Sequence, residues 1–163
     1  MSNPDSFTPA NASRRAPIPI QHCGLAMAAQ LLGDRWSLLI LREAFYGVTR
    51  FEDLRADLNA PRAALSQRLE TLVEFGILSR VPYREAKSRT RHEYRLTDVG
   101  QDLALVLIAL MQWGDRHLRD DAPPLKVIEK STGESLSVAL VNTRGRIVHL
   151  DDVAQTIAES GGS

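Results

Sequence analysis

The stretch Thr49–Ile77, TRFEDLRADLNAPRAALSQRLETLVEFGI, decides the fold of this 163-residue chain. It predicts two helices joined by a tight turn. The first is expected over Phe51–Leu58, where Thr49 and Glu52 have the spacing of a capping box. In that motif the two side chains satisfy each other's free backbone N–H groups at the helix start.

The turn and the second helix follow from three residues. Asn59 adopts turn conformations readily. Pro61 is tolerated in the first turn of a helix, and Gly76 is the usual residue just past a helix end. Two helices with so short a connection predict a helix-turn-helix, whose second helix enters the major groove of DNA.

The second helix has one apolar face and one polar face. At 100° per residue its large apolar side chains share one stripe about 100° wide; they are Leu65, Leu69, Leu72 and Val73. The opposite face begins with small and uncharged polar side chains, while the acids Glu70 and Glu74 come later. Such a face suits a helix whose first turns approach the bases. The alternative is an ordinary amphipathic surface helix, because this pattern gives many false positives.

The composition excludes several classes of protein. Twenty basic side chains balance twenty acidic ones, so DNA binding would have to rest on a local patch. No apolar run approaches the roughly 18 residues that span a bilayer, and no secretory signal is present. We therefore expect a cytoplasmic protein without membrane contact. One cysteine and four scattered histidines predict neither a disulfide framework nor a metal site, and no cofactor is expected.

The chain divides into three parts. Residues 1–18 are rich in Ser, Asn, Pro and Ala and are expected to form a disordered tail. Residues 19–120 carry the helical patterns and the predicted DNA-binding and dimerisation domain. Pro123-Pro124 begins the extension of residues 121–163, where alternating strand and turn signals predict a β-hairpin or small β-meander. The fold class is therefore α+β and mainly α.

A basic hairpin follows the second helix. The runs ILSRVPY and EYRLT predict two strands around a charged loop, the "wing" of a winged helix-turn-helix. Residues 80–95 hold six basic side chains and only two acids, Glu85 and Glu93. Phosphate binding needs such an excess, because neutralised phosphates release counterions. A solvated hairpin tip is the alternative for this loop.

Two other helices are expected outside the helix-turn-helix, and the second of them suggests a homodimer. Asp34 is a good N-cap for a core helix, RWSLLILREAFY. Thr97 is expected to cap one long helix over residues 98–118, in which every residue from Leu103 to Met111 is apolar. A small domain cannot cover such a helix, so we predict a helix-mediated homodimer that uses Leu103, Leu107, Ile108, Leu110, Met111 and Trp113. A helix expected over Cys23–Leu32 would add area to this contact. The alternative is that residues 125–163 cover the helix within one chain.

Residues 20–120 resemble the HxlR-type winged helix-turn-helix regulators, relatives of the MarR type. The resemblance rests on CGLAMAAQLLGDRWSLLILREAFYGVTRFEDLRADL, LSQRLETLVEFGILSRVPY, HEYRLTDVGQDL and LMQWGDR. It implies a dimeric, cytoplasmic, bacterial transcription regulator, either repressor or activator, that binds a pseudo-palindromic operator. One position departs from the family: Ala63 stands where members often have Asn, which removes an amide that could bond adenine.

The candidate DNA contacts fall into three groups. On the second helix, base readers are expected at Arg62, Ala63, Ser66 and Gln67, because Gln can pair with adenine and Ala can contact a thymine methyl. Phosphate contacts at the helix ends are expected from Thr49, Arg50, Asn59 and Arg68. The wing contacts are Lys87, Arg89 and Arg91. For Arg68 the alternative is an ion pair within the domain, and for Ser66 a plain surface position.

Two inputs could regulate such a protein. Cys23 begins a helix, whose dipole favours the reactive thiolate, and the family often has a cysteine here that senses oxidants in some members. Lone cysteines are more often inert and buried. The other input is an apolar small molecule bound at a dimer interface lined by Leu107, Met111 and Trp113.

Two other function classes compete with DNA binding. An enzyme would need a convergent nucleophile–base or metal constellation, and the sequence has none, so no enzymatic activity is expected. The second class is a winged helix that binds proteins and no DNA.

Overall fold

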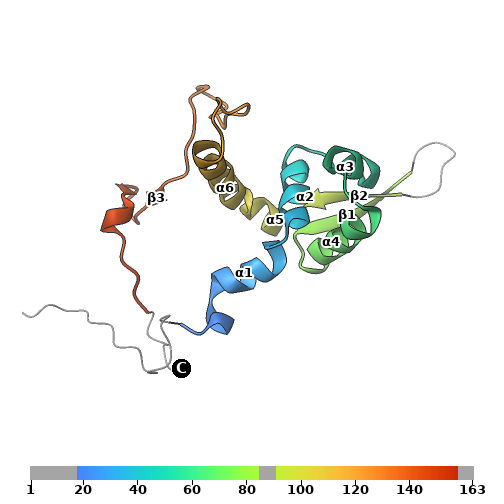
Figure 1. Cartoon of the computed structure of the whole chain (residues 1–163), viewed down its shortest axis with the longest axis horizontal. Coiled ribbons are helices and arrows are strands. Elements are labelled where there is room, and N and C mark those ends of the chain that lie inside the picture. The colour runs from blue at the N-terminus through green and yellow to red at the C-terminus, as the bar shows by residue number, and fades with distance from the viewer. Residues whose placement is uncertain (1–17, 85–90, 158–163) are drawn as a thin grey trace, which may run out of the picture.

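The computed structural model describes residues 18–84 and 91–157. A winged helix-turn-helix occupies one end (Figure 1), and its elements in chain order are α2 (Arg35–Phe45), α3 (Phe51–Leu58), α4 (Arg62–Glu74), β1 (Leu78–Tyr83) and β2 (Arg91–Leu96). The two strands form an antiparallel hairpin that pairs Leu78 with Leu96 and Tyr83 with Arg91. The mixed α+β fold and the wing strands are as predicted.

The core lies between these helices and the base of the hairpin. Its buried side chains are Ile40, Leu41, Leu54, Ala60, Leu65, Leu69, Leu72, Ile77 and Leu78. Three residues of the predicted α4 stripe are fully buried, and Val73 is packed against them. Each buried leucine contributes about 1.5–3 kcal/mol relative to an exposed one. This burial fixes which face of α4 points outward.

Asp34 caps α2 and ties it to α4. Its Oδ1 accepts hydrogen bonds from the Trp36 N–H at 2.9 Å and the Ser37 N–H at 3.1 Å, and the Ser37 hydroxyl donates to Oδ2 at 2.5 Å. Arg68 Nε of α4 lies 3.3 Å from the same Oδ1. Burial raises the pKa of Asp34, but the bonds from Ser37, the Arg68 charge and the Trp36 amide outweigh it, so the pKa is lowered overall.

Replacing Asp34 with alanine is expected to lower the free energy of unfolding by about 1–2 kcal/mol at pH 7. Because the folded-state pKa lies below the unfolded one, the charged part of this contribution is complete above the unfolded pKa. It is lost as the pH falls through the lowered folded pKa. Urea unfolding of the wild type and Asp34→Ala at pH 7 measures the whole contribution. Asp34→Asn keeps a good N-cap and removes the charge, so its difference from the wild type at pH 7 and near pH 2.5 measures the charged part. An equal difference at both pH values would contradict this role of the charge.

The turn between α3 and α4 has the expected backbone. Asn59 ends α3 in the left-handed region at φ 47°, and Gly76 follows α4 with φ 68°. The predicted capping box is wrong: Arg50 is the N-cap of α3, and no side chain caps it. The Thr49 hydroxyl instead donates to Glu93 of β2 at 3.3 Å. The Thr49 hydroxyl, which the sequence pattern predicted would cap α3, is thus bonded to strand β2 of the wing.

A tight junction joins the hairpin to the next helix, α5 (Asp98–Asp102). The Thr97 N–H donates to the Ile77 carbonyl at 3.1 Å, and the Thr97 hydroxyl accepts from the Gly100 N–H at 3.1 Å. Gly100 packs so closely that a Cβ there would lie 2.2 Å from the Ile77 carbonyl oxygen. This contact requires glycine.

The long helix expected over residues 98–118 is interrupted. It divides at Leu103 into α5 and α6 (Ala104–His117). The Leu103 N–H bonds the Gly100 carbonyl, three residues back, at 3.2 Å, which tightens the turn. No proline or glycine at the break signals it. Leu103 and Leu107 still pack against the core, but α6 has no fully buried residue.

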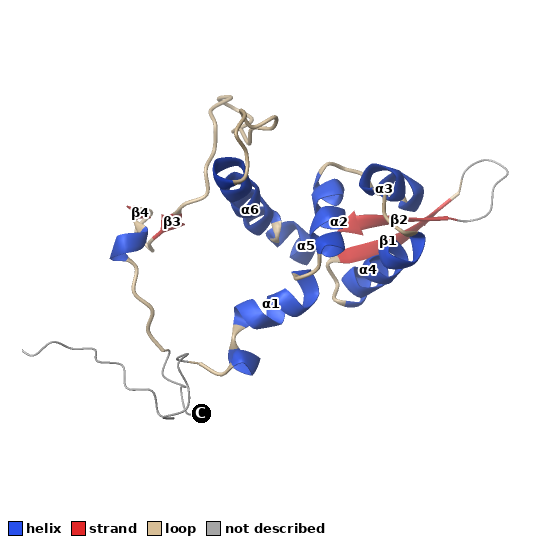
Figure 2. Cartoon of the chain, viewed as in Figure 1, coloured by secondary structure: helices blue, strands red, loops and turns tan. Residues whose placement is uncertain are grey.

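The extension is simpler than a meander. Strands β3 (Leu140–Val141) and β4 (Ile147–Val148) pair only with each other, and a separate bridge joins Ile128 to Ser135. A 3-10 turn, Leu150–Asp152, follows β4. As Figure 2 shows, β3 and β4 lie away from the winged domain. Among the described residues, no helix is both long and apolar enough to cross a membrane.

Candidate nucleic-acid interface

The outward face of α4 carries the predicted base readers. Ala63 and Gln67 are exposed and Ser66 is half-buried, because the core holds the opposite stripe. Only small or uncharged groups therefore stand at the centre of this face.

Arg62, at the start of α4, is held toward α3. Its Nη2 lies 2.5 Å from Glu52 Oε1, and its guanidinium lies 5.0 Å from the centre of the Phe51 ring. Glu52 also accepts a hydrogen bond from Arg55 at 2.9 Å. The Arg62 side chain is still 64% exposed, so it stands at the surface where the two helices meet the wing.

A groove of about 580 Å³ separates the start of α3 and α4 from the wing strands. It is lined by Arg50, Phe51, Glu52, Asp53, Arg62, Arg80, Tyr83, Arg91, His92 and Tyr94. Four arginines face two acids, which makes the groove basic within a chain of zero net charge. Such a surface attracts phosphate.

Aromatic rings and a histidine position the groove arginines. The Arg50 guanidinium lies 4.8 Å from the Tyr83 ring centre, and Arg80 Nη2 lies 3.2 Å from His92 Nδ1. Arg80 is one of the basic side chains of the hairpin but is not among the contacts expected from the sequence, and neither are Tyr83 and His92. The strand register brings Arg80 and His92 together: Arg80 opposes Tyr94 and Pro82 opposes His92, so the two residues are diagonal neighbours across the hairpin.

The structure brings some of the predicted contacts together and leaves others apart. Arg50, Arg62 and Arg91 line one groove. Thr49 and Arg68 are engaged with Glu93 and Asp34 inside the domain; for Arg68 this is the alternative geometry considered above. Asn59 is exposed at the turn. The wing residues Lys87 and Arg89 lie outside the described residues.

A family model described as HxlR-like helix-turn-helix matches residues 31–122. The chain belongs to this HxlR-like family. The match runs from the end of α1 (Gly24–Leu32) through α6, and so covers α4, the wing strands and the groove between them.

Relatives and solved structures of this HxlR-like chain are transcription factors by name. It is 50% identical over 117 residues to Rv3095 of Mycobacterium tuberculosis, an uncharacterised HTH-type transcriptional regulator; the match spans 71% of this chain and 73% of that protein. The crystal structure of PA1607, assigned as a transcription factor, is 33% identical with a TM-score of 0.72, over 83% of this chain and 94% of that one. The structure of PA1374 from Pseudomonas aeruginosa is 32% identical in sequence with a TM-score of 0.60. The match covers 86% of this chain and 95% of that one.

A second surface of the HxlR-like chain is apolar and bare. On α6 the exposed fractions are 67% for Leu105, 46% for Val106 and 50% for Trp113, and on α1 they are 79% for Leu25 and 62% for Met27. The extension is bonded to Gln112 of α6 but leaves these five side chains open, so it covers α6 only in part. We call these five residues the α1/α6 face.

Cys23 is the N-cap of α1, partly buried, and its side chain makes no capping bond. Within residues 18–84 and 91–157, no group of three His, Cys, Asp or Glu side chains is placed to hold a metal ion.

Proposed function

We propose that this chain is a sequence-specific, double-stranded DNA-binding transcriptional regulator that binds a pseudo-palindromic operator as a homodimer. The basic groove between the start of α4 and the wing carries the proposal. It stands beside the exposed face of α4, so a duplex whose major groove received α4 would lay a phosphate strand across Arg50, Arg80 and Arg91.

Direct base reading rests on few groups. Gln67 is the side chain that can pair bidentately with adenine, and Ala63 offers a methyl contact to thymine. Ser66 and Arg62 supply the remaining readers, with Arg62 starting from its pair with Glu52. Much of the affinity therefore comes from phosphate contacts, including Lys87 and Arg89 of the wing.

The α1/α6 face supports the homodimer. Large exposed apolar side chains on two helices favour an interaction site, and a two-fold pair would present two α4 helices to successive turns of the duplex. Of the dimer residues expected from the sequence, Trp113 belongs to this face, whereas Leu107, Ile108, Leu110 and Met111 line a pocket within the chain. The partner in this proposal is a second copy of the chain.

Selection of bound duplexes from a random library by the full chain tests the proposal. The expected result is an inverted repeat with half-sites about 10 base pairs apart, and sedimentation of the complex at the mass of two chains per duplex. No enrichment at low salt would favour the protein-binding winged helix instead.

Gln67→Ala is then expected to weaken binding to the selected duplex by about tenfold to a hundredfold, because one bidentate base contact is lost. Binding to a scrambled duplex should not change. Fluorescence anisotropy measures both, with Gln101→Ala, an exposed glutamine of α5, as the matched control. Equal losses on both duplexes would exclude base reading by Gln67.

Oxidation of Cys23 stays a prediction from the sequence. If it regulates binding, diamide should lower operator affinity in the wild type and leave Cys23→Ser unchanged. Equal affinity of the wild type before and after diamide would rule out this input.

A further inference from the structure

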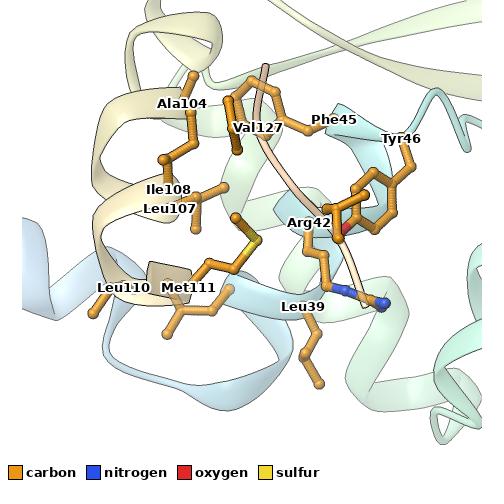
Figure 3. A pocket seen from close by; sticks show the side chains of 12 residues that line it. Leu39, Arg42, Phe45, Tyr46, Ala104, Leu107, Ile108, Leu110, Met111 and Val127 are labelled. Carbon is orange, nitrogen blue, oxygen red and sulfur yellow. The ribbon is translucent and has the colours of Figure 1, made fainter. Parts of the chain in front are cut away.

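A pocket of about 450 Å³ lies between α2 and α6, away from the DNA groove. It is lined by Leu38, Leu39, Arg42, Phe45, Tyr46, Ala104, Leu107, Ile108, Leu110, Met111, Leu125 and Val127. Figure 3 shows the α6 side chains facing those of α2, with Val127 between them. A volume of this size holds a small organic molecule.

The pocket has an apolar body and one polar end. Among its lining residues only Arg42 is charged, and the Tyr46 hydroxyl is the other polar side-chain group. The Arg42 guanidinium lies 5.0 Å from the Tyr46 ring centre, and its Nη1 pairs with Glu43. The Arg42 side chain is 53% exposed. Because a guanidinium has five N–H donors, the pair with Glu43 leaves donors for an anion at this end.

The extension supplies the third wall and is tied to α6. The Gln112 side-chain amide donates to the Leu136 carbonyl at 2.9 Å and accepts from the Val138 N–H at 3.0 Å. The Leu136 N–H in turn donates to the Val127 carbonyl at 2.8 Å. Val127 is thus held over the pocket through a chain of hydrogen bonds that starts on α6.

The pocket and the proposed dimer contact use opposite faces of α6. At 100° per residue, Ala104, Ile108 and Met111 share one side of the helix. Val106 and Trp113 stand about 180° away, on the bare side. A second copy on the α1/α6 face would therefore leave the pocket side of α6 uncovered.

We propose that this pocket binds an apolar acid: a hydrocarbon or aromatic body packed between α2 and α6, with one anionic group on Arg42. The proposal deepens the proposed function by naming the chemical class of its effector. A link to the DNA-binding face exists, since α2 lines the pocket and is joined to α4 by the Asp34–Arg68 pair.

Two fluorescent probes with nearly the same rings test the proposal on the full wild-type chain. 1-Anilinonaphthalene-8-sulfonate carries one anionic group, and N-phenyl-1-naphthylamine lacks it. The anionic probe is expected to bind at one site per chain and roughly tenfold more tightly than the neutral one, as a charged hydrogen bond implies. Equal or reversed affinities would overturn the assignment of an acid.

Two substitutions locate the site. Leu107→Trp, which fills the pocket, is expected to weaken both probes at least tenfold (a larger side chain excludes the ligand). Arg42→Gln should weaken the anionic probe roughly tenfold and leave the neutral probe unchanged. Anionic-probe binding that survives Leu107→Trp but is lost in Trp113→Gln would place the probe on the α1/α6 face and overturn the proposal.

These outcomes are independent of DNA binding. If the chain binds no duplex at all while the probes behave as expected, the pocket stands and the proposed function fails. If duplex binding is found while Leu107→Trp leaves both probes bound, the proposed function stands and the pocket proposal fails. The wild-type comparison of the two probes needs no variant, so it decides the case even where Arg42→Gln, beside the buried Glu43, fails to fold.

Discussion

Gly100→Ala is expected to lower the free energy of unfolding by about 3 kcal/mol, near the upper end of overpacking effects. An alanine Cβ would lie 2.2 Å from the Ile77 carbonyl oxygen and 3.0 Å from a Leu96 methyl. The oxygen cannot yield easily, because it also accepts the Thr97 N–H. The backbone junction between the wing and α5 would have to open.

Gly114→Ala in α6 is the matched control, since a Cβ there would meet nothing within 4 Å. Alanine favours a helix over glycine by about 1 kcal/mol, so this variant should be slightly more stable than the wild type. Urea unfolding followed by circular dichroism measures both. A Gly100→Ala chain as stable as Gly114→Ala would contradict the close contact at Ile77.

The double variant Arg80→Gln/Arg91→Gln is expected to lose about a hundredfold or more in affinity for the selected duplex at low salt. Both side chains line the basic groove, and each would neutralise one phosphate. The slope of log affinity against log salt should therefore become shallower by about 1.8, which is 0.9 for each lost phosphate contact. Anisotropy titrations at four salt concentrations give both quantities.

Arg144→Gln is the control for this pair, because Arg144 is an exposed residue in the turn between β3 and β4, remote from the groove. Its slope should equal that of the wild type. Loss of affinity with an unchanged slope in the double variant would mean that Arg80 and Arg91 act on the fold of the wing and not on phosphate.

The sequence predicted those features that depend on local periodicity and backbone chemistry. The leucine stripe of α4, the Asp34 cap and the stop at Gly76 all follow from neighbours within a few residues, and the structure confirms them. The break at Leu103 and the true partner of Thr49 could not be predicted in this way. Each depends on a segment distant in the chain: Leu103 packs against the core, and Thr49 meets Glu93, 44 residues later.

The candidate DNA site was predicted unevenly for the same reason. Its basic composition could be predicted from the sequence, because the arginines cluster in the wing. Its geometry could not be predicted from the sequence. The groove forms only when β1 and β2 pair and an antiparallel β-bridge joins the backbones of Arg50 and Glu93. The position of Arg68 in the sequence therefore predicted a phosphate contact, whereas in the folded domain Arg68 forms an ion pair with Asp34.

The two hydrogen bonds by which the Gln112 side chain holds the extension, here called the Gln112 clasp, have a consequence for mutational tolerance. Its amide bonds only main-chain atoms of Leu136 and Val138, and every residue type except proline at position 138 offers the same carbonyl and N–H. Leu136 and Val138 can therefore be substituted without loss of these two hydrogen bonds, whereas few side chains could replace Gln112. A deep mutational scan should therefore show a permissive stretch held by a single intolerant position.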